Sequence, residues 1–169
     1  MSDRGAGRVV VAPDKFKGSL SASEAALAIE RGLRAVWPSR EIVRAPMADG
    51  GEGTVAAFLD AGWTRVVRRV RGPLGRAVDA AFALAPGGET AAIEMAAASG
   101  LATLAGAPND VLRASSFGTG ELVRAALEQG ARRIVVGLGG SATNDGGAGL
   151  LEALGMRFFD ADDRALAPG

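Results

Sequence analysis

The strongest constraint on the fold is a local pattern that occurs three times along the chain. A short apolar run is followed by a polar loop containing glycine and then by a run with helical periodicity, at residues 8–36, 41–62 and 133–154. Short continuous apolar runs predict buried strands, and the periodic runs predict helices. Successive strand–helix units favour a mostly parallel sheet covered by helices.

Capping residues, proline and glycine at the ends of these runs set the expected bounds of the helices. Ser21 and Glu24 form a capping-box pattern that predicts a helix over residues 22–36, which Pro38 ends. Gly130 closes a predicted helix over 121–129, and a further helix is predicted over 150–154.

The middle of the chain departs from this pattern. Short strands between residues 65 and 95 are separated by the turn sequences at 72–75 and 86–88, which predicts an antiparallel meander. We therefore expect an α/β fold with a Rossmann-like N-terminal lobe over residues 1–68 and a second mixed α/β lobe over 69–169. The sequence ends in loop chemistry with no closing element, which suggests a fragment whose second lobe is incomplete.

Composition limits the chemistry. The 169 residues are 48% hydrophobic with a formal net charge of +0, so we expect neither a nucleic-acid nor a membrane partner. No apolar run approaches the length of a membrane span, and we predict a cytoplasmic protein. The absence of cysteine and histidine excludes disulfides, a histidine base and a Ser-His-Asp triad. Carboxylates, lysines, hydroxyls, amides and backbone N–H groups remain available.

Two polar clusters lie at the first two strand–helix junctions, where open α/β sheets place ligands. The first holds Lys15 and Lys17, the only lysines in a chain rich in arginine, and it suits a phosphate held by a compact ammonium group. An ordinary solvated loop is the alternative. The second holds Asp49 and Glu52 with two glycines between them, and it could orient a hydroxyl or bind Mg²⁺ or be an ordinary acidic loop.

The third cluster is the glycine-rich loop, residues 137–149. Residues 137–142 match the dinucleotide pattern G-x-G-x-x-A, which leaves a dinucleotide-dependent oxidoreductase as one reading. The polar stretch 143–147 separates this pattern from the next helix, and the lysine of a Walker loop is absent. Glycine N–H groups among Ser, Thr, Asn and Asp fit a phosphate bridged by Mg²⁺ better. A flexible surface loop is the remaining alternative.

Four segments carry a resemblance to a known family. They are PDKFKGSLSA at 13–22, ADGGEGT at 48–54, SFGTGEL at 116–122 and GGSATNDGGAG at 139–149. In this order they resemble the motifs of bacterial glycerate kinases of the class that yields 2-phosphoglycerate. The resemblance implies an ATP- and Mg²⁺-dependent kinase with a cleft between two lobes. It also implies family chains that continue well beyond residue 169 and whose C-terminal part completes the first lobe, over residues 1–68.

The resemblance and the residue chemistry together predict roles for the site residues. We expect Lys17, Asp49 and Asp145 to be catalytic, and Thr119 to be an ordinary helix N-cap rather than a phosphate contact. The predicted substrate- or phosphate-binding residues are Asp14, Lys15, Ser19, Glu52, Gly139, Gly140, Ser141 and Thr143, and the predicted metal ligands are Asn144 and Asp145. The expected function is ATP- and Mg²⁺-dependent phosphorylation of D-glycerate. The alternatives are an inactive structural fragment of such a kinase and, less well supported, the dinucleotide-binding oxidoreductase.

Overall fold

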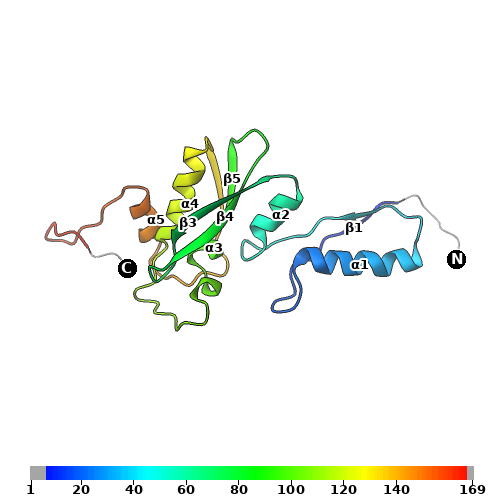
Figure 1. The fold of residues 1–169 in the computed structure, drawn as a ribbon, viewed down its shortest axis with the longest axis horizontal. Helices are drawn as coiled ribbons and strands as arrows, with labels where there is room; N and C mark the ends of the chain where they lie inside the picture. Colours follow the sequence, from blue (N-terminus) through cyan, green and yellow to red (C-terminus); the bar gives the residue numbers. More distant parts are fainter. Residues whose placement is uncertain (1–6, 167–169) are drawn as a thin grey trace. The chain divides into compact units, whose positions relative to one another are not determined.

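The structure is a computed structural model that describes residues 7–166 (Figure 1). The chain forms two compact units, Met1–Asp49 and Gly50–Gly169. The expected lobes 1–68 and 69–169 do not coincide with these units, because residue 68 lies inside a strand that is paired throughout its length in the second unit. How the complete protein divides into lobes stays a prediction.

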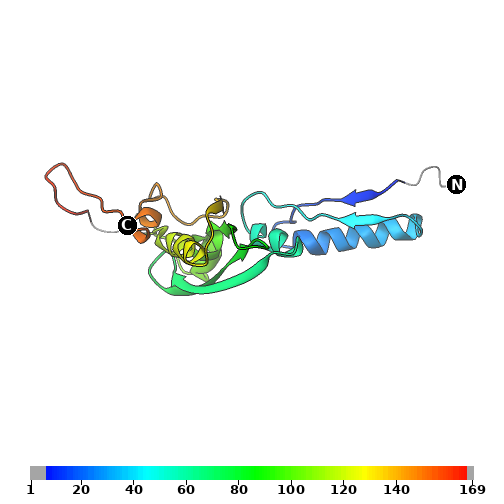
Figure 2. The ribbon, with the colours of Figure 1, turned by 90° about the horizontal axis from the view of Figure 1, so that it is seen from above.

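The first unit contains one strand–helix–strand repeat. Strands β1 (Val9–Val11) and β2 (Ile42–Arg44) pair in parallel, and helix α1 (Ala22–Val36) connects them. Figure 2 shows α1 running alongside the two strands. The predicted helix is confirmed, and so is its capping box. The Ser21 hydroxyl accepts the Glu24 N–H at 3.2 Å, and the Glu24 carboxylate accepts the Ser21 N–H at 2.8 Å.

The second unit contains a four-stranded sheet of order β3-β4-β5-β6. The predicted meander is confirmed, because β4 pairs antiparallel with both β3 and β5. Strand β6 is parallel to β5, so the expectation of parallel pairing holds for β1–β2 and β5–β6 only. The four strands are β3 (Thr64–Arg71), β4 (Ala77–Leu84), β5 (Thr90–Glu94) and β6 (Arg133–Gly137).

The crossover from β5 to β6 passes through helix α3 (Met95–Ser99), a 3₁₀ turn η1 (Leu101–Leu104) and helix α4 (Phe117–Glu128). Successive residues of a strand point to opposite faces, so this sheet buries apolar side chains on both. Phe82 and Ile93 are fully buried in one cluster with Leu122 of α4. Ala83 and Ala92 lie in a second cluster with Val55 of helix α2 (Thr54–Asp60).

Helix α4 begins at Phe117 rather than at residue 121 as predicted. Glycine is unfavourable inside helices, yet Gly118 and Gly120 both lie in the first four residues of α4. The structure uses both for close packing. A Cβ on Gly118 would overlap the Arg71 carbonyl, and one on Gly120 would lie 2.7 Å from the Ala153 Cβ in helix α5 (Ala148–Ala153). Helix α5 likewise starts two residues before its predicted position at 150.

The prediction that Thr119 caps a helix is wrong. Ser116 occupies the N-cap position, and Thr119 lies inside the first turn of α4, where its side chain is fully buried. Its hydroxyl forms a hydrogen bond of 2.8 Å with the Ser99 hydroxyl. Thr119 therefore joins α3 to α4.

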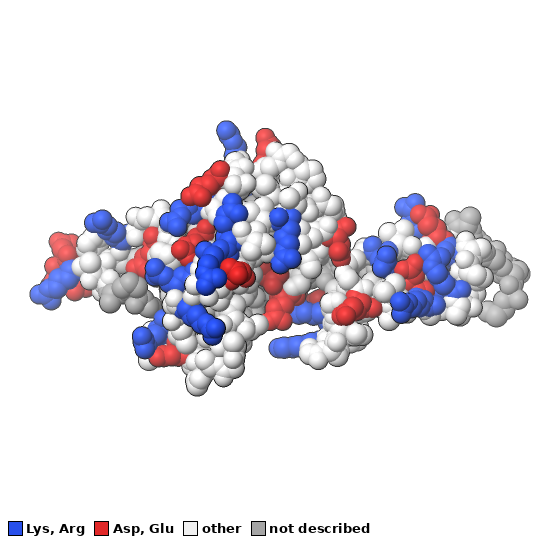
Figure 3. Space-filling model, in the orientation of Figure 1, with Lys and Arg blue, Asp and Glu red and all other residues white. Residues whose placement is uncertain are grey.

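Charged side chains of both signs are interspersed on the face drawn in Figure 3. Over the part of the chain that the structure describes, every helix is too short or too polar to cross a membrane.

Candidate functional site

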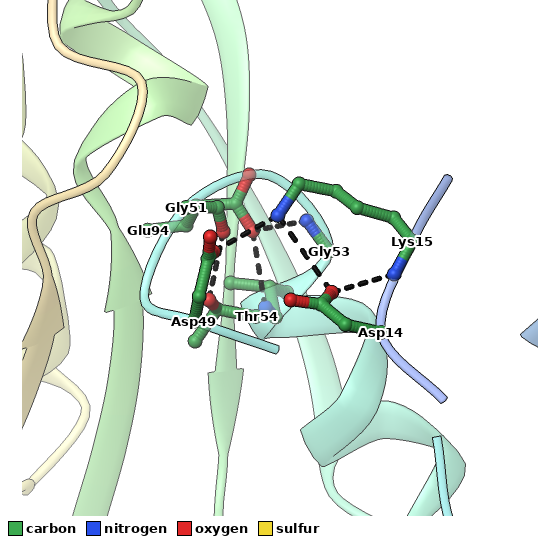
Figure 4. A network of polar contacts seen from close by, with 8 residues as sticks. Asp14, Lys15, Asp49, Gly51, Gly53, Thr54 and Glu94 are labelled. Atoms are coloured by element: carbon green, nitrogen blue, oxygen red, sulfur yellow. Dashed lines mark hydrogen bonds and ion pairs between the residues drawn. The ribbon is translucent and has the colours of Figure 1, made fainter. Parts of the chain in front are cut away.

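The lysine-bearing loop follows β1 in the first unit. The Lys15 ammonium lies 2.9 Å from the Asp49 carboxylate and 3.7 Å from the Asp14 carboxylate (Figure 4). The Lys15 backbone N–H also donates to Asp14 at 2.6 Å. The carboxyl ends of β1 and β2 meet at one sheet edge, which explains why residues so far apart in sequence come together.

Lys17 and Ser19 do not join this arrangement. Both are exposed, and the Ser19 hydroxyl donates to the Phe16 carbonyl at 3.2 Å within a tight turn. Lys15 is therefore the lysine that the fold directs at Asp49, whereas sequence reasoning gave the leading role to Lys17. Both roles stay predictions.

The loop at 50–53 begins the second unit and contacts the glycine-rich loop through backbone atoms. The Gly139 N–H donates to the Gly50 carbonyl at 2.9 Å. A Cβ on Gly139 would lie 2.6 Å from the Gly51 Cα, and one on Gly137 would overlap Gly50. These glycines thus allow two loops to touch. Because the Gly139 N–H already has an acceptor, it is not available to the predicted phosphate cradle.

Two of the four polar side chains of the glycine-rich loop bond to each other. The hydroxyls of Ser141 and Thr143 lie 2.9 Å apart, and the Thr143 N–H donates to the Ser141 hydroxyl at 3.0 Å. Asn144 and Gly140 are exposed, as is Glu52 in the loop at 50–53. These five residues thus divide into two hydroxyls that bond to each other and three exposed residues.

Asp145 links the start of α4 to the start of α5. One carboxylate oxygen accepts the N–H and the hydroxyl of Ser116, both at 2.8 Å, together with the Gly149 N–H at 3.1 Å. The other oxygen accepts the Gly147 N–H at 3.1 Å. Ser116 is fully buried, and its hydroxyl accepts the Leu150 N–H at 2.9 Å. One carboxylate thus collects donors from both helix starts, where N–H groups otherwise lack partners.

Two opposing effects act on the pKa of Asp145. Partial burial would raise the pKa, but the hydrogen bonds from Ser116, Gly147 and Gly149 favour the charged form and lower it below its ordinary value of 3.8. Asp145 is therefore a carboxylate held in its ionised state by the fold.

Sequence reasoning missed Glu94, the last residue of β5. This side chain is 9% exposed, and one of its oxygens accepts the N–H groups of Gly53 and Val55, each at 3.1 Å (Figure 4). Glu94 thereby caps α2 and fixes the 50–53 loop, with Gly137 beside it on β6. The available signal was a single acidic residue that ends an apolar strand and precedes an alanine-rich run.

The pKa of Glu94 is displaced in the opposite direction from that of Asp145. Burial raises it above the ordinary value of 4.5, and the N–H donors of Val55 and Gly53 offset only part of this effect. The negative charge of Glu52 adds to the increase.

The predicted metal ligands are Asn144 and Asp145. Over residues 7–166, no group of three or more acidic side chains is placed to share an ion. The Asp145 carboxylate is already engaged by four donors, and Asn144 beside it is exposed. Ligation by Asn144 and Asp145 stays a prediction, and the geometry gives Asp145 a structural role.

The dinucleotide reading receives no support from the geometry. In that motif the helix begins within the glycine pattern, so that its N-terminus meets the pyrophosphate. Here α5 begins at Ala148, beyond the pattern at 137–142, and the Gly139 N–H is bonded to Gly50.

The family model of the glycerate kinase family matches residues 9–169. The chain belongs to the glycerate kinase family. Glycerate kinase of Bacillus subtilis is 50% identical over 163 residues, and glycerate 2-kinase of Escherichia coli is 50% identical over 165 residues. Each alignment covers 96% of this chain and 43% of the relative.

A solved structure also resembles this glycerate kinase family chain. The crystal structure of putative glycerate kinase 2 from Salmonella typhimurium LT2 has a TM-score of 0.84 and 50% sequence identity. The match covers 98% of this chain and 44% of that structure. The family and the mixed α/β fold that the sequence indicated are confirmed. The chain spans less than half the length of these relatives.

Proposed function

We propose that the protein containing this chain transfers the γ-phosphoryl group of ATP, with Mg²⁺, to D-glycerate and forms 2-phosphoglycerate. Family membership supports phosphorylation of glycerate, and the Escherichia coli relative is named a glycerate 2-kinase. ATP and Mg²⁺ are included because phosphoryl transfer draws on a nucleoside triphosphate whose phosphates are bridged by a metal. A cytoplasmic location is proposed from the sequence alone.

The observation that carries the chemistry is the pair of Lys15 and Asp49 at the carboxyl ends of two parallel strands. Phosphoryl transfer needs positive charge near the moving group and a positioned acceptor hydroxyl rather than a covalent intermediate. The Lys15 ammonium supplies a compact cation that Asp14 and Asp49 hold in place. The Asp49 side chain is 64% exposed, so a substrate hydroxyl can reach its carboxylate.

The experiment is a coupled assay of ADP release by the full-length protein with D-glycerate, ATP and Mg²⁺, with ³¹P NMR to identify the phosphorylated hydroxyl. Glycerate-dependent release with 2-phosphoglycerate as product supports the proposal. Release without glycerate, or NADH binding without ATP binding, contradicts it. The same assay on the 169-residue chain decides whether that chain alone is an inactive structural part.

Lys15→Met and Lys17→Met form a matched pair of variants in this assay. We expect Lys15→Met to lower kcat/KM by about 100-fold, or about 2.7 kcal/mol of transition-state stabilisation. Lys17→Met tests whether the exposed lysine contributes as well. An unchanged rate for Lys15→Met would remove Lys15 from the mechanism.

A further inference from the structure

A pocket of about 280 Å³ lies in the second unit, and none of its lining residues is among the site residues that the sequence predicted. It is lined by the turn that joins β3 to β4 and by the segment that precedes α4. Its polar lining is Arg71, Asp110, Arg113 and Ser115, and its remaining lining is the turn 73–75.

The walls of this pocket are fixed by hydrogen bonds. The Ser115 N–H donates to the Pro73 carbonyl at 2.9 Å, which ties the segment before α4 to the turn. The Gly72 N–H donates to the Arg76 carbonyl at 2.7 Å and closes the turn. The N–H groups of Arg113 and Ala114 both donate to the Asp110 carbonyl, at 3.1 and 2.9 Å. The pocket is therefore formed by the fold before any ligand enters.

Arg71 is held in place from two sides. Its backbone N–H donates to the Glu121 carboxylate at 2.6 Å, and its guanidinium lies 4.0 Å from the centre of the Phe117 ring. An arginine stacked on an aromatic ring keeps the N–H groups at its edge available to a carboxylate or phosphate. In the segment 7–166, neither Arg71 nor Arg113 forms an ion pair, with Asp110 or with any other acid.

We propose that this pocket binds the anionic group of a small hydroxy acid. Arg71 and Arg113 hold its carboxylate, and Asp110 accepts a hydrogen bond from an adjacent hydroxyl. The charged groups of the lining are two guanidinium groups and the single carboxylate of Asp110, and this excess of positive charge favours an anion. Arginine recognises carboxylates through paired N–H donors. The volume is at the lower end of the roughly 300–1,000 Å³ typical of ligand pockets, which favours a hydroxy acid over a nucleotide.

The inference rests on the proposed function, because it takes D-glycerate as the hydroxy acid to test. Arginine recognises the phosphates of a nucleotide in the same way, so the experiment separates the two sources. Isothermal titration calorimetry on the full-length protein uses D-glycerate, inorganic phosphate and ADP as separate probes. The variants are Arg71→Gln and Arg113→Gln, with Arg65→Gln as control. Arg65 is an exposed arginine on the same strand as Arg71 and lies outside the pocket.

We expect each pocket variant to weaken D-glycerate binding by at least about tenfold, which corresponds to about 1.4 kcal/mol. The Arg65→Gln control should bind D-glycerate as the unmodified protein does. Arg113→Lys keeps the charge but loses the paired donors, so its affinity for D-glycerate should lie between that of Arg113→Gln and that of the control. If a melting curve shows that Arg113→Gln is unfolded, Arg113→Lys is measured in its place.

Three results overturn the proposal. The first is that the unmodified protein does not bind D-glycerate, and the second is that the pocket variants bind D-glycerate as tightly as the unmodified protein does. The third is that the variants weaken binding of ADP or phosphate alone, which would assign the arginines to the nucleotide.

The assay of turnover separates this inference from the proposed function. A protein that phosphorylates glycerate while the pocket variants bind it normally contradicts the pocket alone. A protein that binds glycerate through these arginines without turnover contradicts the function alone.

Discussion

The lysine loop at 14–19 and the glycine-rich loop at 137–149 both follow the carboxyl end of a parallel strand, but they use their polar groups differently. Lys17 and Ser19 are exposed in the first. In the second, Asp145 accepts four hydrogen bonds, and the Gly139 N–H is bonded to another loop. Substitutions in the glycine-rich loop will therefore disturb the fold together with any ligand binding, whereas substitutions in the lysine loop will report on ligands more directly.

The largest expected effect tests the close packing around α4 and α5. Gly120→Ala places a methyl group 2.7 Å from the Ala153 Cβ and against the Leu150 backbone, so we expect it to lower the free energy of unfolding by about 3 kcal/mol. Urea unfolding of the full-length protein measures this change.

The control is a glycine with open space. Gly32 lies inside α1 and has no atom within 4 Å of an added Cβ, so Gly32→Ala should raise the free energy of unfolding by about 0.5–1 kcal/mol. A Gly120→Ala variant as stable as the unmodified protein would show that α4 and α5 move apart to accommodate the added methyl group.

The second effect tests Asp145 as a structural carboxylate. Asp145→Asn keeps the shape but removes the charge that strengthens its hydrogen bonds, so we expect a loss of about 2 kcal/mol in unfolding free energy. Asn144→Ala, at the exposed neighbouring position, should change stability by less than about 0.5 kcal/mol. If Asp145→Asn abolishes turnover at unchanged stability, Asp145 acts on a ligand and the comparison of the two loops is wrong.

The third effect uses the opposite pKa displacements of two carboxylates. The raised pKa of Glu94 means that its stabilising contribution is complete below pH 4.5 and is lost as pH rises through the folded-state pKa. Glu94→Gln cannot ionise, so its stability relative to the unmodified protein should increase from pH 4 to pH 7.

Asp145 should behave in the reverse manner. Its lowered pKa gives a contribution that is present above its ordinary value of 3.8 and is lost as pH falls through the folded-state pKa. Unfolding curves of Glu94→Gln and Asp145→Asn between pH 3 and pH 7 should therefore diverge from the unmodified protein in opposite directions. Parallel curves would show that the surroundings of the two carboxylates are alike.

The smallest expected effect concerns the lysine loop. Lys15→Met removes an ion pair whose Asp49 partner is largely exposed, so we expect stability to change by less than about 1 kcal/mol while turnover falls. Thermal unfolding with and without D-glycerate checks this. A large loss of stability would place Lys15 with the structural residues of the second loop.

The parts of the fold that local chemistry determines were predictable from the sequence. The helix at 22–36 carries its own cap and stop signals, and the meander carries its own turns. The start of α4 was not predictable, because the atoms that leave no room for a side chain at Gly118 and Gly120 come from distant segments.

The same limit applies to the site. Residue types indicated where polar groups gather, but the contact of Lys15 with Asp49 became visible only in the structure. Sequence spacing could not reveal that Asp145 is engaged by Ser116, or that Glu94 caps a helix some forty residues earlier. Such roles depend on tertiary contacts, which a single sequence does not display.

The parallel pairing of β5 with β6 has a consequence for how the chain is made. The hairpin of β3 and β4 joins neighbouring segments, whereas β6 reaches β5 only after the whole stretch through α3 and α4. Contacts between distant segments form slowly, and synthesis proceeds from the N-terminus. On the ribosome, β5 therefore waits with an unpaired edge until residue 137 has emerged, and this interval is when the nascent protein is most exposed to pairing with another chain.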